Sequence, residues 1–162
     1  MKKVGIVMGS DSDLPIIKKA TDTLKALDIP FEVHVYSAHR TPDQARDFAR
    51  SARAEGFGAI IAAAGMAAHL AGAIAANTTL PVIGIPCSSA VLDGIDALLA
   101  TVQMPSGIPV ATVAVNGGVN AALLCAQILA VEDTELARKL DDKRRNDAAA
   151  VLEKDAGIAD RL

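Results

Sequence analysis

The sequence predicts an α/β fold in which five parallel strands alternate with helices. Short apolar runs and amphipathic or alanine-rich segments follow one another five times, and the links between them are short. The run 59–64 is apolar throughout, which is typical of a strand covered on both faces. Since crossover connections are right-handed, we expect a doubly wound parallel sheet with flavodoxin-like strand order, followed by a long C-terminal helix.

The first two strand–helix units have the clearest patterns. Residues 4–8 form a short apolar run that Gly9 ends, and this pattern predicts a buried strand. Segment 14–27 places its apolar residues on one helical face and its lysines elsewhere. Strand 31–36 and helix 41–55 are expected to follow.

The middle of the chain is expected to repeat the unit twice. Strand 59–64 leads into segment 67–77, which is rich in alanine and predicted to be helical. Strand 81–85 is expected to end at Pro86, and helix 89–102 to follow it.

The last unit should complete one domain that spans residues 1–162. Pro109 is tolerable as the first residue of strand 109–115, and helix 119–131 comes next. The core is expected to cover about 4–132, with a charged helix at about 134–154 and a frayed tail after it.

The amino-acid composition excludes several classes of function. Its 162 residues carry a net charge of −3, and aromatic residues make up 2% with no tryptophan, so a nucleic-acid partner is not expected. Cys87 and Cys125 form no CxxC or Cys/His cluster, which fits a reducing cytoplasm. Neither a signal peptide nor a membrane-spanning segment is expected.

Two expected helices are too apolar to leave one side exposed to solvent. Segments 121–130 and 67–76 are apolar almost all round, and such helices are normally buried on every side. A sheet covers only one side of each, so we expect a second copy to cover the other. The sequence therefore predicts a homo-oligomer.

Polar residues gather at one edge of the expected sheet. Four loops follow the carboxyl ends of the first four strands: residues 9–13, 37–40, 65–69 and 86–89. Ligands of doubly wound sheets bind at this edge, so the loops predict a site.

Simpler interpretations stay open for several of these residues. Ser10, Ser12 and Asp13 are also good helix caps, and His69 lies in an apolar segment where a core histidine is common. Thr41 and Pro42 also predict a helix start, with Gln44 completing a capping box.

The residue types at this edge narrow the chemistry. Metal-ligand spacing, a GxSxG elbow and a phosphate loop are all missing from the sequence. His39 has an imidazole whose unperturbed pKa of ~6.5 suits proton transfer. Arg40 can bind a phosphate or carboxylate, and Asp13 can accept hydrogen bonds from sugar hydroxyls. Together they predict proton-transfer chemistry on a small ribose-phosphate.

Several motifs resemble the PurE family, the N5-carboxyaminoimidazole ribonucleotide mutases of purine biosynthesis. The motifs occur in the family's order from about residue 4 to 152: Gly9-Ser10-Asp11-Ser12-Asp13, Ser37-Ala38-His39-Arg40-Thr41-Pro42, Ala67-Ala68-His69-Leu70, Gln103-Met104-Pro105-Ser106-Gly107-Ile108-Pro109-Val110 and Asn120-Ala121-Ala122-Leu123-Leu124. His69 and Arg40 resemble the mutase branch rather than the branch that carboxylates aminoimidazole ribonucleotide directly with carbon dioxide.

The resemblance implies an isomerase that moves a carboxyl group from N5 to carbon 4 of the ribonucleotide by decarboxylation and recarboxylation. His39 matches the general acid/base. The matching substrate-binding positions are Ser10, Asp13, Ser37, Ala38, Arg40, Gly65, His69 and Leu70. No metal or other cofactor is implied, and the family members that this chain resembles are cytoplasmic octamers.

Two substitutions depart from the family pattern. Met66 and Ala71 stand where many mutases have glycine and proline, and this puts the geometry of the loop 65–70 in question. The carboxylase branch is one alternative function, and a flavodoxin-like carrier module is a second alternative of a different class. The carrier fits poorly, because only Tyr36 could offer a flavin an aromatic ring near this edge.

Overall fold

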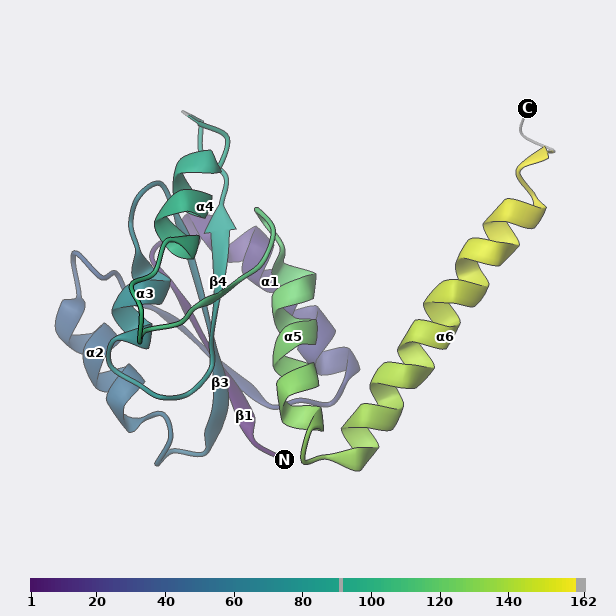
Figure 1. The fold of residues 1–162 in the computed structure, drawn as a ribbon, viewed down its shortest axis with the longest axis horizontal. Coiled ribbons are helices and arrows are strands. Elements are labelled where there is room, and N and C mark those ends of the chain that lie inside the picture. The colour runs from purple at the N-terminus through teal and green to yellow at the C-terminus, as the bar shows by residue number, and fades with distance from the viewer. Residues whose placement is uncertain (91, 160–162) are drawn as a thin grey trace.

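The computed structural model describes residues 1–90 and 92–159 and shows the predicted sheet (Figure 1). Five parallel strands lie in the order β2-β1-β3-β4-β5, so the doubly wound prediction is confirmed. The strands are β1 Lys3–Met8, β2 Phe31–Val35, β3 Phe57–Gly65, β4 Val82–Cys87 and β5 Ala111–Thr112. The helices are α1 Leu14–Ala26, α2 Pro42–Ser51, α3 Leu70–Ala75, α4 Ile95–Val102, α5 Gly118–Ala130 and α6 Thr134–Ala156, with a 3₁₀ turn at Asp11–Asp13.

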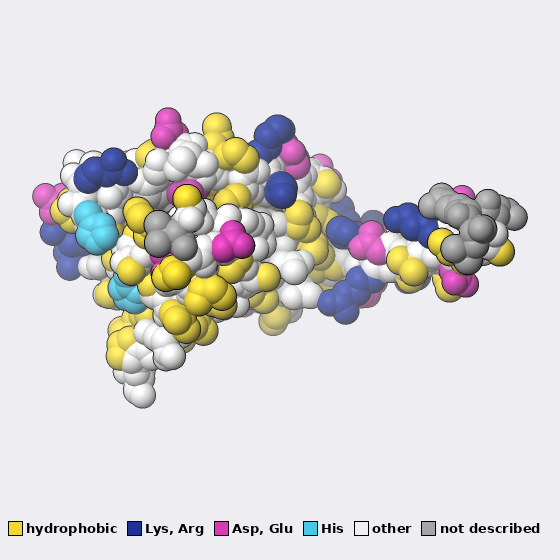
Figure 2. Space-filling view, turned by 90° about the horizontal axis from the view of Figure 1, so that it is seen from above, with side chains coloured by type: hydrophobic (Ala, Val, Ile, Leu, Met, Phe, Trp, Pro, Cys, Tyr) yellow, Lys and Arg dark blue, Asp and Glu magenta, His cyan; other side chains and the backbone are white. Residues whose placement is uncertain are grey.

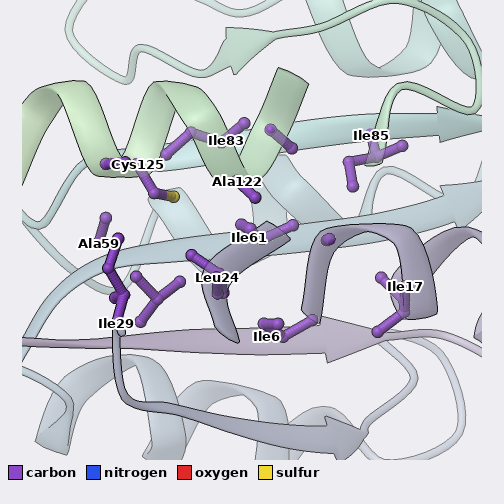
Figure 3. Packing of buried hydrophobic residues seen from close by; sticks show 14 of the residues in the cluster. Ile6, Ile17, Leu24, Ile29, Ala59, Ile61, Ile83, Ile85, Ala122 and Cys125 are labelled. Atoms are coloured by element: carbon purple, nitrogen blue, oxygen red, sulfur yellow. The ribbon is translucent and has the colours of Figure 1, made fainter. Parts of the chain in front are cut away.

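Helices cover both faces of the sheet. In Figure 1, α1 and α5 lie on one side of it and α2 and α3 on the other. The alternation of strand side chains produces these two cores, since consecutive residues point to opposite faces. One core contains Ile6, Ile61 and Ile83, which are register neighbours across β1, β3 and β4 (Figure 3). The second core contains Val7, Ile60 and Val82.

The α5 helix is covered within its own chain more completely than the sequence suggests. It packs on β3 and β4, lies against α1 and contacts the start of α6, where Leu136 is fully buried. A Cβ at Gly118 would lie 2.4 Å from the carbonyl oxygen of Ile16, so glycine permits the close approach of α1 and α5. Five of the six residues of α3 are also buried. The apolar character of these two helices therefore does not by itself require a second copy.

Four elements are shorter than their patterns predict, and the first is α2, which ends at Ser51 rather than at 55. α3 begins at Leu70 rather than 67, because Met66 and His69 both have left-handed backbones with φ near 54°. α4 begins at Ile95 rather than 89, since Asp93 and Gly94 also have positive φ, and residue 91 of that expected helix lies outside the described residues.

β5 is the fourth short element, with two residues in place of the expected seven. Pro86 has no N–H to donate toward β5, and Asn116 turns the chain away with a positive φ of 58°. The 109–115 segment still runs beside β4, because the amide of Val113 donates to the carbonyl of Gly84 at 3.1 Å.

α6 extends away from the sheet (Figure 1). Its first turns contact α5, and beyond Leu140 its residues are largely exposed. The expected tail ends outside the described residues, which stop at 159. Within the described residues, none of the helices is both long and apolar enough to cross a membrane.

Candidate active site

A pocket of about 480 Å³ opens at the carboxyl edge of the sheet, where the four polar loops meet. Figure 2 looks toward this edge and shows histidine side chains beside apolar ones. The lining residues come from the ends of β1 to β4 and the loops that follow: Gly9, Ser10, Ser12, Asp13, Ser37, Ala38, His39, Arg40, Ala64, Gly65, Met66, Ala68, Leu70, Ser88 and Ser89. The structure thus brings together eight of the nine residues predicted for the site, and His69 is the exception.

The first loop is organised by Ser10. Its Oγ accepts hydrogen bonds from the amide of Ser12 at 3.3 Å and from the hydroxyl of Ser12 at 2.9 Å. Ser10 therefore caps the short 3₁₀ turn, and the capping role considered for Ser12 belongs to Ser10.

Asp13 stands directly before α1 but makes no side-chain capping bond. Its carboxylate is half-buried, and burial raises its pKa, while a hydrogen bond from the Cys87 thiol acts in the opposite direction. Among the described residues, this carboxylate neither caps a helix nor joins an ion pair, so it is available to a ligand. Because burial is the larger effect, the charged form of Asp13 is less stable here than in water.

The second loop is a tight turn held by Ser37 and Thr41. The Oγ of Ser37 accepts from the amides of His39 at 3.3 Å and Arg40 at 3.1 Å. The Oγ1 of Thr41 accepts from the amide of Ser37 at 2.8 Å, so it bonds upstream and makes no capping bond to α2. The predicted capping box with Gln44 is therefore wrong, although α2 does begin at Pro42.

These bonds present His39 and Arg40 to the pocket. The His39 side chain is exposed, and among the described residues no protein group hydrogen-bonds its ring. One guanidinium nitrogen of Arg40, Nη2, donates to the carbonyl of Gly9 at 3.0 Å and thus joins the second loop to the first. The other guanidinium donors remain available for an anion.

The third loop forms an apolar wall, which we define as Ala64 to Ala68 together with Leu70. The residues of this wall that line the pocket offer no side-chain charge or hydroxyl. Met66 is 62% exposed at the rim rather than packed inside. Its backbone is left-handed, a conformation that glycine, the residue of the family pattern noted above, adopts without strain.

His69 lies outside the pocket lining. Its Nδ1 is 2.6 Å from the carbonyl oxygen of Ala100 in α4, and the side chain is exposed. It is neither a core histidine nor a residue that lines the pocket. The predicted contact between His69 and substrate therefore stays a prediction, and the pocket lining gives it no support.

The fourth loop adds Ser88 and Ser89, which the predicted set of site residues does not include. Asn116 holds Ser88 through two bonds: its Oδ1 accepts from the Ser88 amide at 2.9 Å, and its Nδ2 donates to the Ser88 hydroxyl at 2.8 Å. The Ser89 hydroxyl is buried without a partner among the described residues and lines the pocket. Both serines follow the fourth strand at the carboxyl edge of the sheet, and this position in the sequence could have placed them in the predicted site.

A larger hollow of about 880 Å³ lies at the opposite edge of the sheet, lined among others by Arg50, Arg53 and Thr79. α2 and α3 end there, so arginines near it compensate the negative ends of the helix dipoles. Residues 1–90 and 92–159 contain no group of three or more His, Cys, Asp or Glu side chains that could hold a metal ion.

Comparison with known proteins places this site in a known family. Residues 3–150 match the family described as AIR carboxylase. The chain is 55% identical over 152 residues to the N5-carboxyaminoimidazole ribonucleotide mutase of Bacillus subtilis, an alignment that covers 93% of this chain and 94% of the relative. It is 52% identical over 153 residues to the Escherichia coli K12 protein of the same name, covering 93% and 90%.

A solved structure agrees with the sequence relatives. The crystal structure of Treponema denticola PurE superposes with a TM-score of 0.86 at 30% identity, covering 94% of this chain and 96% of that one. The family match and the identities extend over nearly the whole chain, including all four loops that form the pocket. This chain therefore belongs to the AIR carboxylase family.

Proposed function

We propose that this chain is an isomerase of purine biosynthesis that converts N5-carboxyaminoimidazole ribonucleotide into 4-carboxy-5-aminoimidazole ribonucleotide. Relatives with the mutase name share more than half of its residues over most of both chains. The observation that carries the proposal is a pocket with an unpartnered imidazole, polar loops on one side and an apolar wall on the other.

The polar loops suit the ribose phosphate. Asp13 accepts from ribose hydroxyls, because its carboxylate is not engaged in capping α1. Ser10, Ser37 and Arg40 bind the phosphate. The Ser37 hydroxyl only accepts bonds from its own loop, so its proton can be donated to a phosphate oxygen, whereas the Ser10 hydroxyl now makes a long 3.4 Å bond to Asp11 that a phosphate oxygen would replace.

The apolar wall suits the carboxyl group in transit. Carbon dioxide is uncharged and is attacked by water, so a dry surface both holds and protects it. Gly65 and Leu70 of this wall line the pocket, as does Ala38 of the second loop. About 480 Å³ is enough for one ribonucleotide and is within the usual range of small-molecule sites.

His39 transfers one proton in each of two steps. As an imidazolium it donates a proton to N5 while the N5–carboxyl bond breaks and carbon dioxide forms. Carbon 4 of the substrate then attacks the carbon dioxide to form the new carbon–carbon bond, and neutral His39 removes the proton from carbon 4. His39 returns to its starting form, and because substrate and product are isomers no cofactor is required.

The test is to incubate the purified protein with the carboxyamino substrate, without ATP or bicarbonate, and to follow the ultraviolet absorbance of the product. We expect turnover by the wild type, its loss in His39→Asn with the circular dichroism unchanged, and normal turnover in His34→Asn. His34 is a matched control because it lies in β2, stacks on Tyr36 and does not line the pocket. Wild-type rates in His39→Asn would refute the mechanism.

The same assay separates the two branches of the family. If the protein carboxylates aminoimidazole ribonucleotide with added bicarbonate and leaves the carboxyamino substrate unchanged, it is a carboxylase and the mutase proposal is wrong.

We also propose that the protein is a cytoplasmic homo-oligomer, and specifically an octamer. Four apolar side chains along one side of the α4 region are exposed by 48–57%, and they follow heptad-like spacing: Leu92, Ile95, Leu99 and Val102. α6 carries two more, Val151 and Leu152, exposed by 63% and 68% on a helix that leaves the body. Such faces favour burial against another copy, and the two unpaired thiols fit a reducing compartment.

Light scattering should give eight chain masses at micromolar concentration. Leu99→Asp should lower the number of chains in the assembly. Asp22→Asn, on the solvent-exposed face of α1, should not. A monomeric wild type would contradict the oligomer, and a stable assembly of another size would contradict only the octamer.

A further inference from the structure

The apolar wall of the pocket has an unfavourable backbone. Met66 and His69 both adopt left-handed conformations, with φ of 53° and 54°. A Cβ is disfavoured in this region, so neither residue adopts it without support from its surroundings. The wall therefore needs a contact that holds it in place.

His69 provides a contact of this kind with α4. Its Nδ1 lies 2.6 Å from the carbonyl oxygen of Ala100, and because a carbonyl only accepts, Nδ1 carries the proton. Ala100 is in the last turn of α4, where helical carbonyls lack partners. The amide four residues on, that of Met104, donates to Val102 instead. The imidazole thus satisfies a carbonyl that α4 leaves open.

Gly72 makes room for this ring. A Cβ at Gly72 would lie 2.1 Å from Nε2 and 2.3 Å from Cε1 of His69, which is far inside van der Waals contact. The imidazole therefore lies directly against the first turn of α3, between α3 and α4.

We propose that His69 is a positioning residue, whose hydrogen bond to Ala100 fixes the apolar wall so that carbon dioxide stays in the pocket. The inference rests on the proposed mutase function and gives His69 a role that requires no contact with substrate. His69 does not line the pocket, but its neighbours Ala68 and Leu70 do. Freeing the imidazole would release the wall between Met66 and α3 and open the apolar side to water.

Two near-identical substitutions test the hydrogen bond. His69→Asn places an amide nitrogen where Nδ1 now lies, so it can still donate to Ala100, whereas His69→Asp offers only oxygen acceptors there. Asparagine and aspartate both tolerate left-handed backbones, so the pair differs mainly in the donor.

The readout is the fate of the carboxyl carbon. Substrate labelled with ¹³C in that carboxyl group is incubated with excess unlabelled bicarbonate and carbonic anhydrase, and the label in the product is measured. We expect wild type and His69→Asn to retain the label, and His69→Asp to release roughly 2- to 10-fold more of it, the factor that one lost hydrogen bond would give. Gly72→Ala, which pushes the ring from its place, should release label in the same way and serves if His69→Asp does not fold.

Three results would overturn the proposal. Full label retention in a folded His69→Asp or in Gly72→Ala would show that the hydrogen bond does not control escape. Equal loss in Asn and Asp variants would show that the imidazole itself acts on the substrate. If the wild type leaves the labelled substrate unconverted, the proposed function is wrong. If the wild type turns over normally and the variants retain label, only the positioning role of His69 is wrong.

Discussion

Asp13→Asn is expected to make the protein more stable and less active at the same time. Burial raises the pKa of the Asp13 carboxyl group above its ordinary value. The folded state therefore binds this proton more tightly than the unfolded state does. A raised pKa gives stability that is fully present below the unfolded value of ~3.9 and is lost as pH rises through the folded value. At pH 7.5 the ionised carboxylate thus destabilises the fold.

Asparagine has nearly the same shape but no charge to desolvate. The melting temperature of Asp13→Asn should exceed that of the wild type at pH 7.5, and the difference should shrink as the pH falls through the pKa of Asp13. Differential scanning fluorimetry at several pH values measures this directly.

The activity should move in the opposite direction. In the proposed site the Asp13 carboxylate accepts hydrogen bonds from ribose hydroxyls. A hydrogen bond to a charged group contributes about 1.5–3 kcal/mol, so its loss should lower kcat/KM by roughly 10- to 150-fold. Most of the effect should appear in KM, because the ribose is bound equally in the ground state and the transition state.

Asp11→Asn is the matched control. It removes the same charge two residues away, from an exposed side chain that does not line the pocket. We expect its melting temperature and KM to stay near the wild-type values. A lower melting temperature for Asp13→Asn, or an unchanged kcat/KM, would refute the reasoning, because the carboxylate would then be either stabilising or absent from the ribose site.

Three further outcomes can be measured. Arg40→Gln should raise KM about 10- to 150-fold by the loss of one charge-assisted contact, measured by initial rates, and an unchanged KM would remove Arg40 from the phosphate site. Gly118→Ala should lower stability by ~1–3 kcal/mol, measured by urea unfolding, because its Cβ would lie 2.4 Å from the Ile16 carbonyl; unaltered stability would mean that α1 and α5 separate freely. Burial raises the pKa of Cys87 to about 12 and raises that of Cys125 as well, so neither thiol should react with Ellman's reagent at pH 8 until urea is added; rapid labelling of the native protein would contradict the burial.

The order of the strands was predictable from the sequence because the strand–helix pattern repeats along the whole chain. Strands such as β3 are apolar along nearly their whole length, and each is separated from the next by a helical segment. Right-handed crossovers leave few ways to assemble such a chain. The position of the site followed from the same argument, since the carboxyl ends of the strands share one edge.

Details that depend on single backbone angles were not predictable. Glycine marks left-handed positions in a sequence, but Met66, His69 and Asp93 adopt them without such a mark. The alanine-rich pattern at 67–77 therefore predicted a helix that starts three residues too early. The same angles move His69 out of the pocket that its position in the motif suggested.

The hydrogen-bond partners of the serine and threonine hydroxyls were not predictable either. Ser10, Ser12 and Thr41 all have the residue type of a cap, and sequence alone does not say which neighbour each one bonds. Thr41 bonds the backbone of Ser37 instead of the first turn of α2, and this choice tightens the loop that carries His39. A capping signature can thus stand before a helix while its hydroxyl bonds upstream and tightens the preceding loop.

The polar and apolar halves of the pocket are held in place by different contacts. Substitutions in the two halves should therefore have different effects. On the polar half, Ser37 fixes its own turn, Arg40 joins it to the carbonyl of Gly9, and Asn116 clamps Ser88, so several bonds hold each loop. The apolar wall contains left-handed Met66 and adjoins left-handed His69, whose imidazole bonds to α4. We therefore expect changes in the polar half to weaken substrate binding while the wall stays in place. Changes at the imidazole bond should leave binding nearly intact and alter the fate of the carbon dioxide. KM measures the first effect and label retention measures the second.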